Sequence, residues 1–262
     1  MTLRLVHLSD IHFGGEDRDA TEAAVAAAHA FEPTLTIVSG DLTLNGLPRE
    51  FAAARRWLDR LPTPLLVTPG NHDTPYWNIP LRAFTPFGRY RRYIGPADQS
   101  LFETPELAVY ALNSARGGQL RLNWSLGALD LPTLERLTAR FAANPKAAKV
   151  FVCHHPLIEI EGAPVEAGIR CGDEAARHLA AAGVDLILTG HLHTPFTRPL
   201  PYAGGHSFCC GAGTLSIRTR GVPASYSTIE IDDATSHVAA LTWTGSKFEP
   251  FRSWALPRRA AG

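Results

Sequence analysis

The stretch from Thr36 to Thr43 reads TIVSGDLT, and the interpretation of the whole chain starts from it. Residues 34–38 are apolar or β-branched and predict a buried strand, after which Gly40 opens the backbone and presents Asp41 at the strand's carboxyl end. Open α/β sheets bind their ligands at this edge. One Asp after one strand is more often the cap of a following helix, so Asp41 indicates a site only if similar residues follow other strands.

Four further apolar runs end in the same way. LRLVHL precedes SDIH, PLLVT precedes PGNHD, AKVFVC precedes HHP, and VDLILT precedes GHLH. Six of the eleven histidines directly follow these runs, namely His12, His72, His154, His155, His191 and His193. Histidines that are merely solvated have no reason to gather at strand ends, so we interpret the set as one shared site at a sheet edge.

The order of elements indicates the fold class. Apolar spacing predicts helices over residues 19–31, 48–61, 132–141 and 172–182, between the strands named above. After residue 201 the chain changes to short alternating runs, which predict antiparallel strands from about 205 to 256 that complete a second sheet. We therefore expect one domain over residues 1–262, an α/β/β/α sandwich of two mixed sheets flanked by helices.

Composition limits the classes of function. Lys+Arg and Asp+Glu are both 25, so we expect neither general nucleic-acid binding nor attraction to an anionic membrane. The four cysteines have no C-x-x-C spacing, which disfavours a thiolate zinc site and a disulfide framework. The first strand begins almost directly after Met1, and no apolar run approaches the length of a membrane span. These features favour a cytoplasmic protein with a small-molecule partner; they do not indicate its oligomeric state.

The polar residues at the strand ends are all nitrogen or oxygen donors. The candidate metal ligands are Asp10, His12, Asp41, Asn71, His154, His191 and His193. Two divalent ions about 3.5 to 4 Å apart need this many ligands and one bridging carboxylate, whereas a closed structural site needs only about four. Asp41 is the natural bridge. This donor set suits Mn, Fe, Zn or Co, and the sequence does not choose among them.

Two ligand pairs, Asp10 with His12 and His191 with His193, are two residues apart. Side chains at this spacing share one face of an extended segment. We therefore expect each pair to follow its strand in extended conformation and to bind on one side of it.

The five blocks SDIH, GDLT, GNHD, HHP and GHLH, taken together, resemble the calcineurin-like metallophosphoesterases over residues 3–195. The resemblance implies that Asp10, His12, Asp41 and His193 hold one metal, and that Asp41, Asn71, His154 and His191 hold the second. It also implies that His72 faces the substrate as a catalytic residue. Leu44 stands where the Ser/Thr protein phosphatases keep an Asp paired to the active-site histidine, so the sequence leaves open what orients His72.

Within that family the blocks narrow the activity. GNHD in place of GNRD argues against lipid-A-precursor pyrophosphatases, and the lack of a GDxVDRG block argues against Ser/Thr protein phosphatases. GDLT with HHP is most similar to the bacterial cyclic-nucleotide and glycerophosphodiester phosphodiesterases. The implied reaction is in-line attack on a phosphodiester by a hydroxide that bridges the two ions. A monoesterase, nuclease or pyrophosphatase of the same family is the alternative, and a non-catalytic scaffold is disfavoured because no ligand is missing.

Two further groups are candidates for substrate contact. Aromatic residues alternate with arginines after Asp73, and Arg89, Arg91 and Arg92 could bind a base and its phosphate. A short amphipathic helix with a solvated basic face is the favoured interpretation of this strip. For His155 the sequence leaves two roles open, namely substrate contact or a plain strand-end residue.

Overall fold

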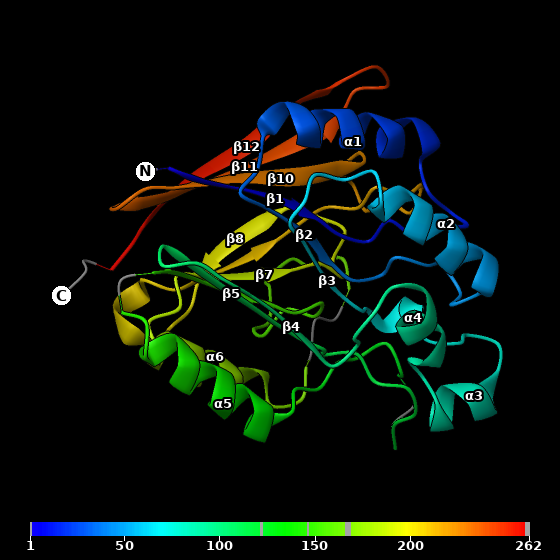
Figure 1. Cartoon of the computed structure of the whole chain (residues 1–262), viewed down its shortest axis with the longest axis horizontal. Coiled ribbons are helices and arrows are strands. Elements are labelled where there is room, and N and C mark those ends of the chain that lie inside the picture. The colour runs from blue at the N-terminus through cyan, green and yellow to red at the C-terminus, as the bar shows by residue number, and fades with distance from the viewer. Residues whose placement is uncertain (1, 121–122, 146, 166–168, 260–262) are drawn as a thin grey trace.

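The computed structural model describes residues 2–120, 123–145, 147–165 and 169–259. Within these ranges the chain forms two six-stranded sheets that pack face to face, with helices on the outer sides (Figure 1). This arrangement confirms the expected α/β/β/α sandwich.

The first sheet has the order β12-β11-β10-β1-β2-β3. Its strands are β1 (Leu3–Leu8), β2 (Leu35–Ser39), β3 (Leu65–Thr68), β10 (Ser225–Ile231), β11 (Thr235–Trp243) and β12 (Phe248–Pro257). The second sheet has the order β4-β5-β6-β7-β9-β8. It consists of β4 (Gln99–Glu103), β5 (Leu107–Leu112), β6 (Ala148–Val152), β7 (Leu186–Thr189), β8 (Phe196–Pro199) and β9 (Phe208–Gly211).

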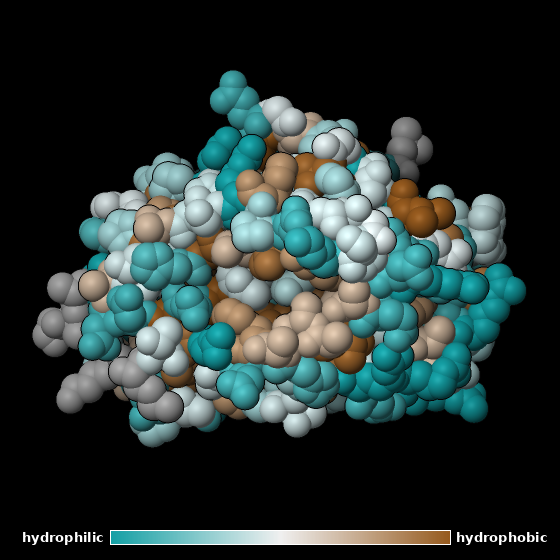
Figure 2. All heavy atoms as spheres, turned by 90° about the horizontal axis from the view of Figure 1, so that it is seen from above, coloured by the Kyte–Doolittle hydropathy of each residue, from teal (hydrophilic) through white to brown (hydrophobic). Residues whose placement is uncertain are grey.

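Helices cover the outer faces of both sheets (Figure 1). The α-helices are α1 (Arg18–Phe31), α2 (Pro48–Leu58), α3 (Ile79–Phe84), α4 (Gly88–Tyr93), α5 (Leu131–Ala142) and α6 (Gly172–Ala181). Helix α1 begins where the Asp17 carboxylate accepts the N–H of Ala20, which satisfies a free donor of the first turn. From the side of α1 the surface is hydrophilic at its margin, with apolar side chains gathered near the middle (Figure 2).

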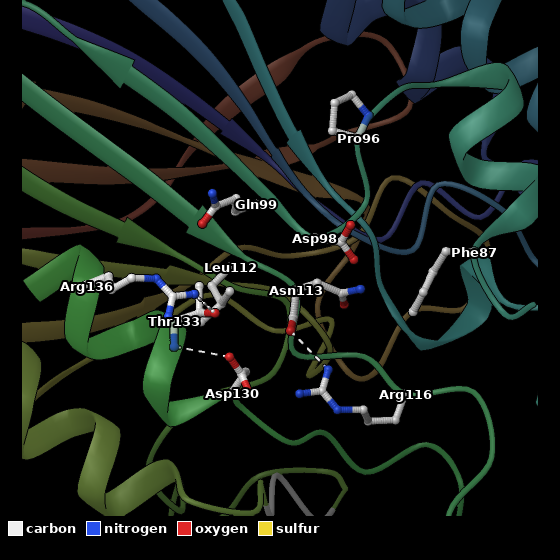
Figure 3. A pocket seen from close by; sticks show the side chains of 10 residues that line it. All are labelled: Phe87, Pro96, Asp98, Gln99, Leu112, Asn113, Arg116, Asp130, Thr133 and Arg136. Carbon is white, nitrogen blue, oxygen red and sulfur yellow. Dashed lines mark hydrogen bonds between the residues drawn. The ribbon is translucent and has the colours of Figure 1, made fainter.

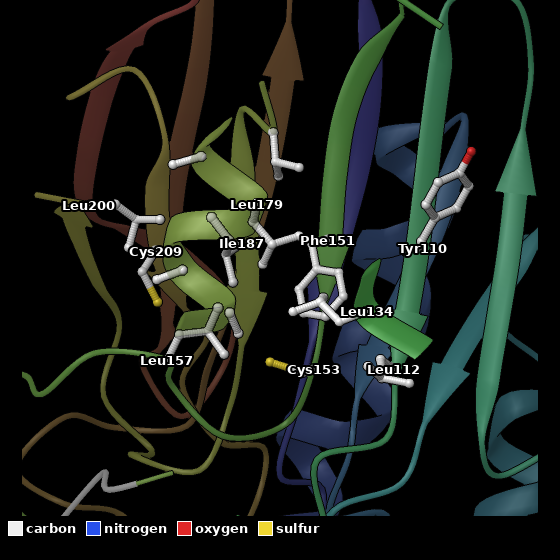
Figure 4. Packing of buried hydrophobic residues seen from close by; sticks show 14 of the residues in the cluster. Tyr110, Leu112, Leu134, Phe151, Cys153, Leu157, Leu179, Ile187, Leu200 and Cys209 are labelled. Carbon is white, nitrogen blue, oxygen red and sulfur yellow. The ribbon is translucent and has the colours of Figure 1, made fainter. Parts of the chain in front are cut away.

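Alternation along the central strands places apolar side chains in three layers. Leu5 and Ile37 of the first sheet pack against Val109 and Val150 of the second. On the outer side of the second sheet, Tyr110 and Phe151 pack with the apolar faces of α5 and α6 (Figure 4). These strands are buried on both faces. Burial of each large apolar side chain stabilises the folded state by about 1.5–3 kcal/mol.

The strands after residue 205 differ from the expectation. β10, β11 and β12 do not complete a second sheet. They extend the sheet of β1, with β10 antiparallel to β1 (Leu3 opposite Ile231). Only β9 joins the second sheet, where it runs parallel to β7. Alternating apolar residues predict a strand but carry no information about its partner, which explains the difference.

Segment 214–218, which lies in the stretch where antiparallel strands are expected, is a loop with one isolated bridge from Ser216 to Glu16. Its backbone groups bind elsewhere, since the N–H of Ile217 donates to the carbonyl of Gly15 and the carbonyl of Thr214 accepts from Ser225. The aromatic and arginine strip forms two short helices, α3 and α4, in place of one. No helix in the described part of the chain is long and apolar enough to cross a membrane.

Candidate metal centre

The seven predicted metal ligands lie together at the carboxyl ends of five strands. Asp10 and His12 follow β1, Asp41 follows β2, Asn71 begins a single 3₁₀ turn after β3, His154 follows β6, and His191 and His193 follow β7. All are buried, and none is more than 7% exposed. The first sheet contributes four of them and the second sheet three, so the site lies at the seam between the sheets.

The backbone at these ligands is unusual. Five of the seven have left-handed conformations, with φ of 54° at Asp10, 52° at His12, 52° at Asp41, 69° at His191 and 57° at His193. The extended geometry expected for the two pairs is therefore wrong. Each such residue costs on the order of 1–3 kcal/mol and persists only where surrounding bonds hold it, as is common at functional sites.

Gly40 has a specific role in this packing. Its φ is +97°, and a Cβ added there would lie 2.7 Å from Nδ1 of His154 and 2.8 Å from the backbone nitrogen of Gly70. Any side chain at position 40 would therefore separate Asp41 from the neighbouring ligand loops.

Three of the ligand histidines are held in one tautomer by backbone carbonyls. Nδ1 lies 3.3 Å from the Thr43 carbonyl in His12, 2.8 Å from the Ser39 carbonyl in His154 and 2.6 Å from the Arg218 carbonyl in His193. A carbonyl only accepts hydrogen bonds, so each Nδ1 carries a hydrogen and Nε2 is the nitrogen left to bind a metal. This is the arrangement that prepares an imidazole to bind a metal.

A first group of candidate ligands consists of Asp10, His12 and His193, and their ring and carboxylate atoms lie close together. Nε2 of His12 lies 3.1 Å from Nε2 of His193, and Oδ1 of Asp10 is 3.1 Å from the latter and 3.7 Å from the former. Asp10 Oδ2 accepts from Ser9 Oγ and from the backbone N–H of His191, whereas Oδ1 is buried without a hydrogen-bond partner among the described residues. Two lone pairs and a carboxylate oxygen at this spacing repel unless a cation lies between them. The residues therefore fit a metal ion.

The carboxylate of Asp41 lies between the two groups of candidate ligands. Its Oδ1 accepts the backbone N–H of His72 at 2.8 Å. Its Oδ2 lies 3.3 Å from Nε2 of His154 and 3.8 Å from Nε2 of His12. Within the described residues, Nε2 of His154 and Oδ1 of Asn71 are buried and without a hydrogen-bond partner, as expected for ligand atoms of a second ion.

The electrostatics of the site favour bound positive charge. Burial by itself lowers the pKa of His154, but the nearby carboxylates of Asp41 and Asp10 outweigh it and raise the pKa to about 9. For Asp41 burial acts to raise the pKa, and the charge of His154 holds it well below its usual value. Burial lowers the pKa of His191 to about 3, which keeps its imidazole neutral and able to bind metal.

A family model for calcineurin-like phosphoesterases matches residues 3–195. The chain belongs to this family. It is 24% identical over 255 residues to a probable cyclic nucleotide phosphodiesterase of Synechococcus sp., with 93% of each chain covered. It is 30% identical over 170 residues to the glycerophosphodiester phosphodiesterase GpdQ of Enterobacter lignolyticus, covering 58% of this chain and 57% of that protein.

Solved structures support the fold of this calcineurin-like phosphoesterase. The purple acid phosphatase PPD1 of yellow lupin aligns with a TM-score of 0.67 at 12% identity, over 98% of this chain and 54% of that one. GAP50, described as the anchor in the inner membrane complex of Plasmodium, aligns with a TM-score of 0.65 at 12% identity, over 98% of this chain and 89% of that one. Family membership makes the protein a metal-dependent phosphoester hydrolase, and the family generally binds two divalent metals.

His72, the expected catalytic residue, is oriented without a carboxylate. Its Nδ1 lies 2.7 Å from the backbone carbonyl of Leu44, so a carbonyl does the work that an Asp side chain does in the protein phosphatases. Its Nε2 lies 3.2 Å from Nη1 of Arg218. Burial lowers the pKa of His72, so the ring is neutral and Nε2 accepts a hydrogen bond from the guanidinium.

His155 is buried, and both of its ring nitrogens bind protein atoms. Nε2 lies 2.7 Å from the Ser125 carbonyl and therefore carries the hydrogen, while Ser114 Oγ donates to Nδ1 at 2.8 Å. Ser114 Oγ also accepts the backbone N–H groups of His154 and His155. These contacts favour a positioning role, in which His155 holds the loop at Ser125 over the metal ligands.

The structure does not bring the three predicted arginines to the site. Arg89 donates to the Gly46 carbonyl at 2.7 Å, Arg91 pairs with Asp98 at 2.9 Å, and the guanidinium of Arg92 lies 5.8 Å from the Tyr93 ring centre. Helix α4 packs beside α2 (Figure 1), so its basic side chains point to other partners.

Two adjoining cavities of about 490 and 380 Å³ open beside the ligands, with Asn71, His72, Asn123, Ser125 and Arg218 lining both. The larger one is also lined by Tyr76, Ile79, Arg82 and Trp124. The smaller one is also lined by Asp41, Val165, His191, His193 and Arg220. Sequence reasoning missed Arg218 and Arg220 because their segment has the alternation of a strand.

A separate cavity of about 650 Å³ lies between α4, β4 and the start of α5 (Figure 3). None of the metal ligands lines it. Its charged residues balance, with Arg116 and Arg136 facing Asp98 and Asp130. This cavity therefore lacks the histidine and carboxylate donors of the candidate metal centre, and its charges cancel.

Proposed function

We propose that the protein is a dimetal-dependent phosphodiesterase that hydrolyses a cyclic nucleotide or another small-molecule phosphodiester. The observation that carries this proposal is the convergence of histidine Nε2 atoms and carboxylate oxygens on both sides of Asp41 Oδ2. We assign one ion to Asp10, His12, Asp41 and His193, and the other to Asp41, Asn71, His154 and His191. Mn, Fe, Zn and Co all suit these donors.

Bound ions of this kind supply Lewis acidity, which lowers the pKa of water and neutralises phosphoryl oxygens. The chain's own residues hold and orient the substrate. Arg218 places a guanidinium at the junction of the two cavities, where it can bind a phosphoryl oxygen or the leaving-group oxygen.

We assign His72 the role of proton donor to the leaving group. An alkoxide is strongly basic, so its departure at neutral pH is helped by a proton from a side chain that titrates near neutrality. In the protein without substrate, burial and Arg218 keep Nε2 of His72 unprotonated. The negative charge of a bound diester would oppose both effects and favour the protonated ring.

The names of the similar proteins support a diester over a monoester, since the Synechococcus and Enterobacter relatives are both named phosphodiesterases. The proposed compartment is the cytoplasm, in keeping with the four cysteines, which are unpaired in the structure.

A substrate panel tests the proposal. Manganese-loaded protein is assayed side by side with a cyclic nucleotide, a glycerophosphodiester and an alkyl monoester. We expect hydrolysis of at least one diester with higher kcat/KM than the monoester. Preference for the monoester, or no hydrolysis of any diester while both ions are bound, contradicts it.

A further inference from the structure

The larger cavity beside His72 has an aromatic and apolar wall that the chemistry of the metal centre does not require. Tyr76, Ile79 and Trp124 contribute to this wall. Tyr76 is 48% exposed and Ile79 60% exposed, and because both line the cavity, part of this uncovered surface is open to a bound group. The Tyr76 ring is within 8° of parallel to the His72 ring, and the ring centres are 6.2 Å apart. His72 follows the candidate ligand Asn71, so the two rings lie side by side near the candidate metal centre.

Two guanidinium groups line the same cavity. Arg82 is 6% exposed, and its Nε donates to the Gly117 carbonyl at 3.1 Å while its Cζ lies 5.5 Å from the Trp124 ring centre. Arg218 is the second. No carboxylate is among the described residues that line this cavity, so its fixed charge is positive.

This combination discriminates among the organic groups that a phosphodiester can carry. A glycerol group gains little from an aromatic wall. A choline or ethanolamine head group is attracted by aromatic rings, but two arginines without a balancing carboxylate repel a cation. A neutral flat ring with acceptor atoms can both stack on an aromatic side chain and accept hydrogen bonds from a guanidinium.

We propose that this cavity binds the nucleobase of a nucleoside phosphodiester and that Tyr76 is its stacking residue. The proposal rests on the proposed function, because it takes the phosphodiester to react at the adjoining metal centre. It goes further by selecting a nucleoside over a glycerol or choline group on the basis of this chain's own cavity residues.

The first test measures binding without hydrolysis. Manganese-loaded protein is titrated calorimetrically with the 5′-methylenephosphonates of adenosine and of ribose, which have no P–O–C bond to cleave. We expect the adenosine compound to bind more tightly to the wild type. Tyr76→Ala should lose about 5- to 150-fold in affinity for it, because one stacked base is worth about 1–3 kcal/mol and tenfold corresponds to 1.4 kcal/mol. Affinity for the ribose compound should stay unchanged.

Two variants separate stacking from loss of structure. Tyr76→Phe keeps the ring and should retain the preference for the adenosine compound. Phe84→Ala removes an aromatic side chain that is 86% exposed on α3 and does not line the cavity, so it should behave as the wild type. Equal affinity of the wild type for the two compounds overturns the nucleobase site, as does an unchanged preference in Tyr76→Ala.

Kinetics give an independent check. Tyr76→Ala should raise KM for cyclic AMP and leave KM for glycerophosphocholine unchanged, whereas a merely structural role would change both. Failure of the two proposals can be told apart. If the adenosine compound is preferred but no diester is hydrolysed, the phosphodiesterase assignment fails and the base site stands. If diesters are hydrolysed without any base preference, only the base site fails.

Discussion

At the scale of single residues, the proposed metal centre depends on strained backbone. Asp10, Asp41 and His193 have positive φ, and short contacts at Gly40 leave no room for a side chain there. The residue types could be predicted, because seven nitrogen and oxygen donors follow apolar runs. The conformation could not, because spacing two residues apart indicates a shared face only where the backbone is extended. The histidine tautomers are also a tertiary property, since the carbonyl partners of Nδ1 lie in segments distant in the sequence.

Asp41→Ala is expected to abolish binding of both ions. The physical reason is that Oδ2 of Asp41 reaches the histidines of both groups, whereas His193 belongs to one group. His193→Ala should therefore keep a partly occupied second ion. Metal analysis of the purified variants, with circular dichroism to confirm folding, measures this. Two ions per chain in Asp41→Ala would end the bridging assignment.

His72→Asn is expected to keep both ions and to lose about 10²- to 10⁴-fold in kcat for an alkyl diester, the usual range for general acid catalysis. An aryl diester with a nitrophenolate leaving group needs little protonation, so its loss should be clearly smaller. Rates are compared on the same preparations after metal analysis. Equal losses for the two substrates would show instead that His72 stabilises the phosphoryl group.

At the scale of elements, the strands that deliver ligands were predictable and the loop that supports them was not. The sequence predicts β1 over residues 3–8, as the structure has it, because five of its six residues are buried and most of those are apolar. Segment 214–218 has a similar alternation, yet Thr214 Oγ1 donates to the Asp10 carbonyl and the Arg218 carbonyl accepts from His193. Its function comes from contacts with residues more than 20 positions away, which local pattern does not encode.

Replacing Arg89, Arg91 and Arg92 together by Ala is expected to leave kcat and KM for a diester within about twofold of the wild type. None of the three lines either cavity beside the metal ligands, and Arg91 is paired with Asp98 on the surface. Arg218→Ala serves as the comparison and should raise KM, since its guanidinium lines both cavities. Steady-state kinetics decide. A large loss of kcat/KM in the triple variant with normal metal content would show that the α4 arginines contribute to substrate binding.

At the scale of the whole molecule, the proposed metal centre takes its ligands from both sheets. Asp10, His12, Asp41 and Asn71 come from the first sheet and His154, His191 and His193 from the second. The aliphatic layer between the sheets holds them together by apolar burial, but the converging carboxylates and lone pairs at the seam oppose that contact. The layered architecture could be predicted from the pattern of apolar residues. The repulsion between the ligand atoms could not, because it arises only when the two sheets pack face to face.

Metal loading is therefore expected to stabilise the entire domain. A ligand that binds only the folded state stabilises it by about 2.7 kcal/mol at 100 times its dissociation constant. At roughly 2–4 °C per kcal/mol for a chain of this size class, one ion should raise Tm by about 5–10 °C, and removing metal with a chelator should reverse the shift. Calorimetric scans of metal-loaded and chelator-treated protein measure it. Asp41→Ala should lose the metal-dependent part, whereas Arg91→Ala, distant from the seam, should keep it. If manganese raises Tm of Asp41→Ala as much as that of the wild type, the stabilisation does not come from this site, and the ions do not link the two sheets.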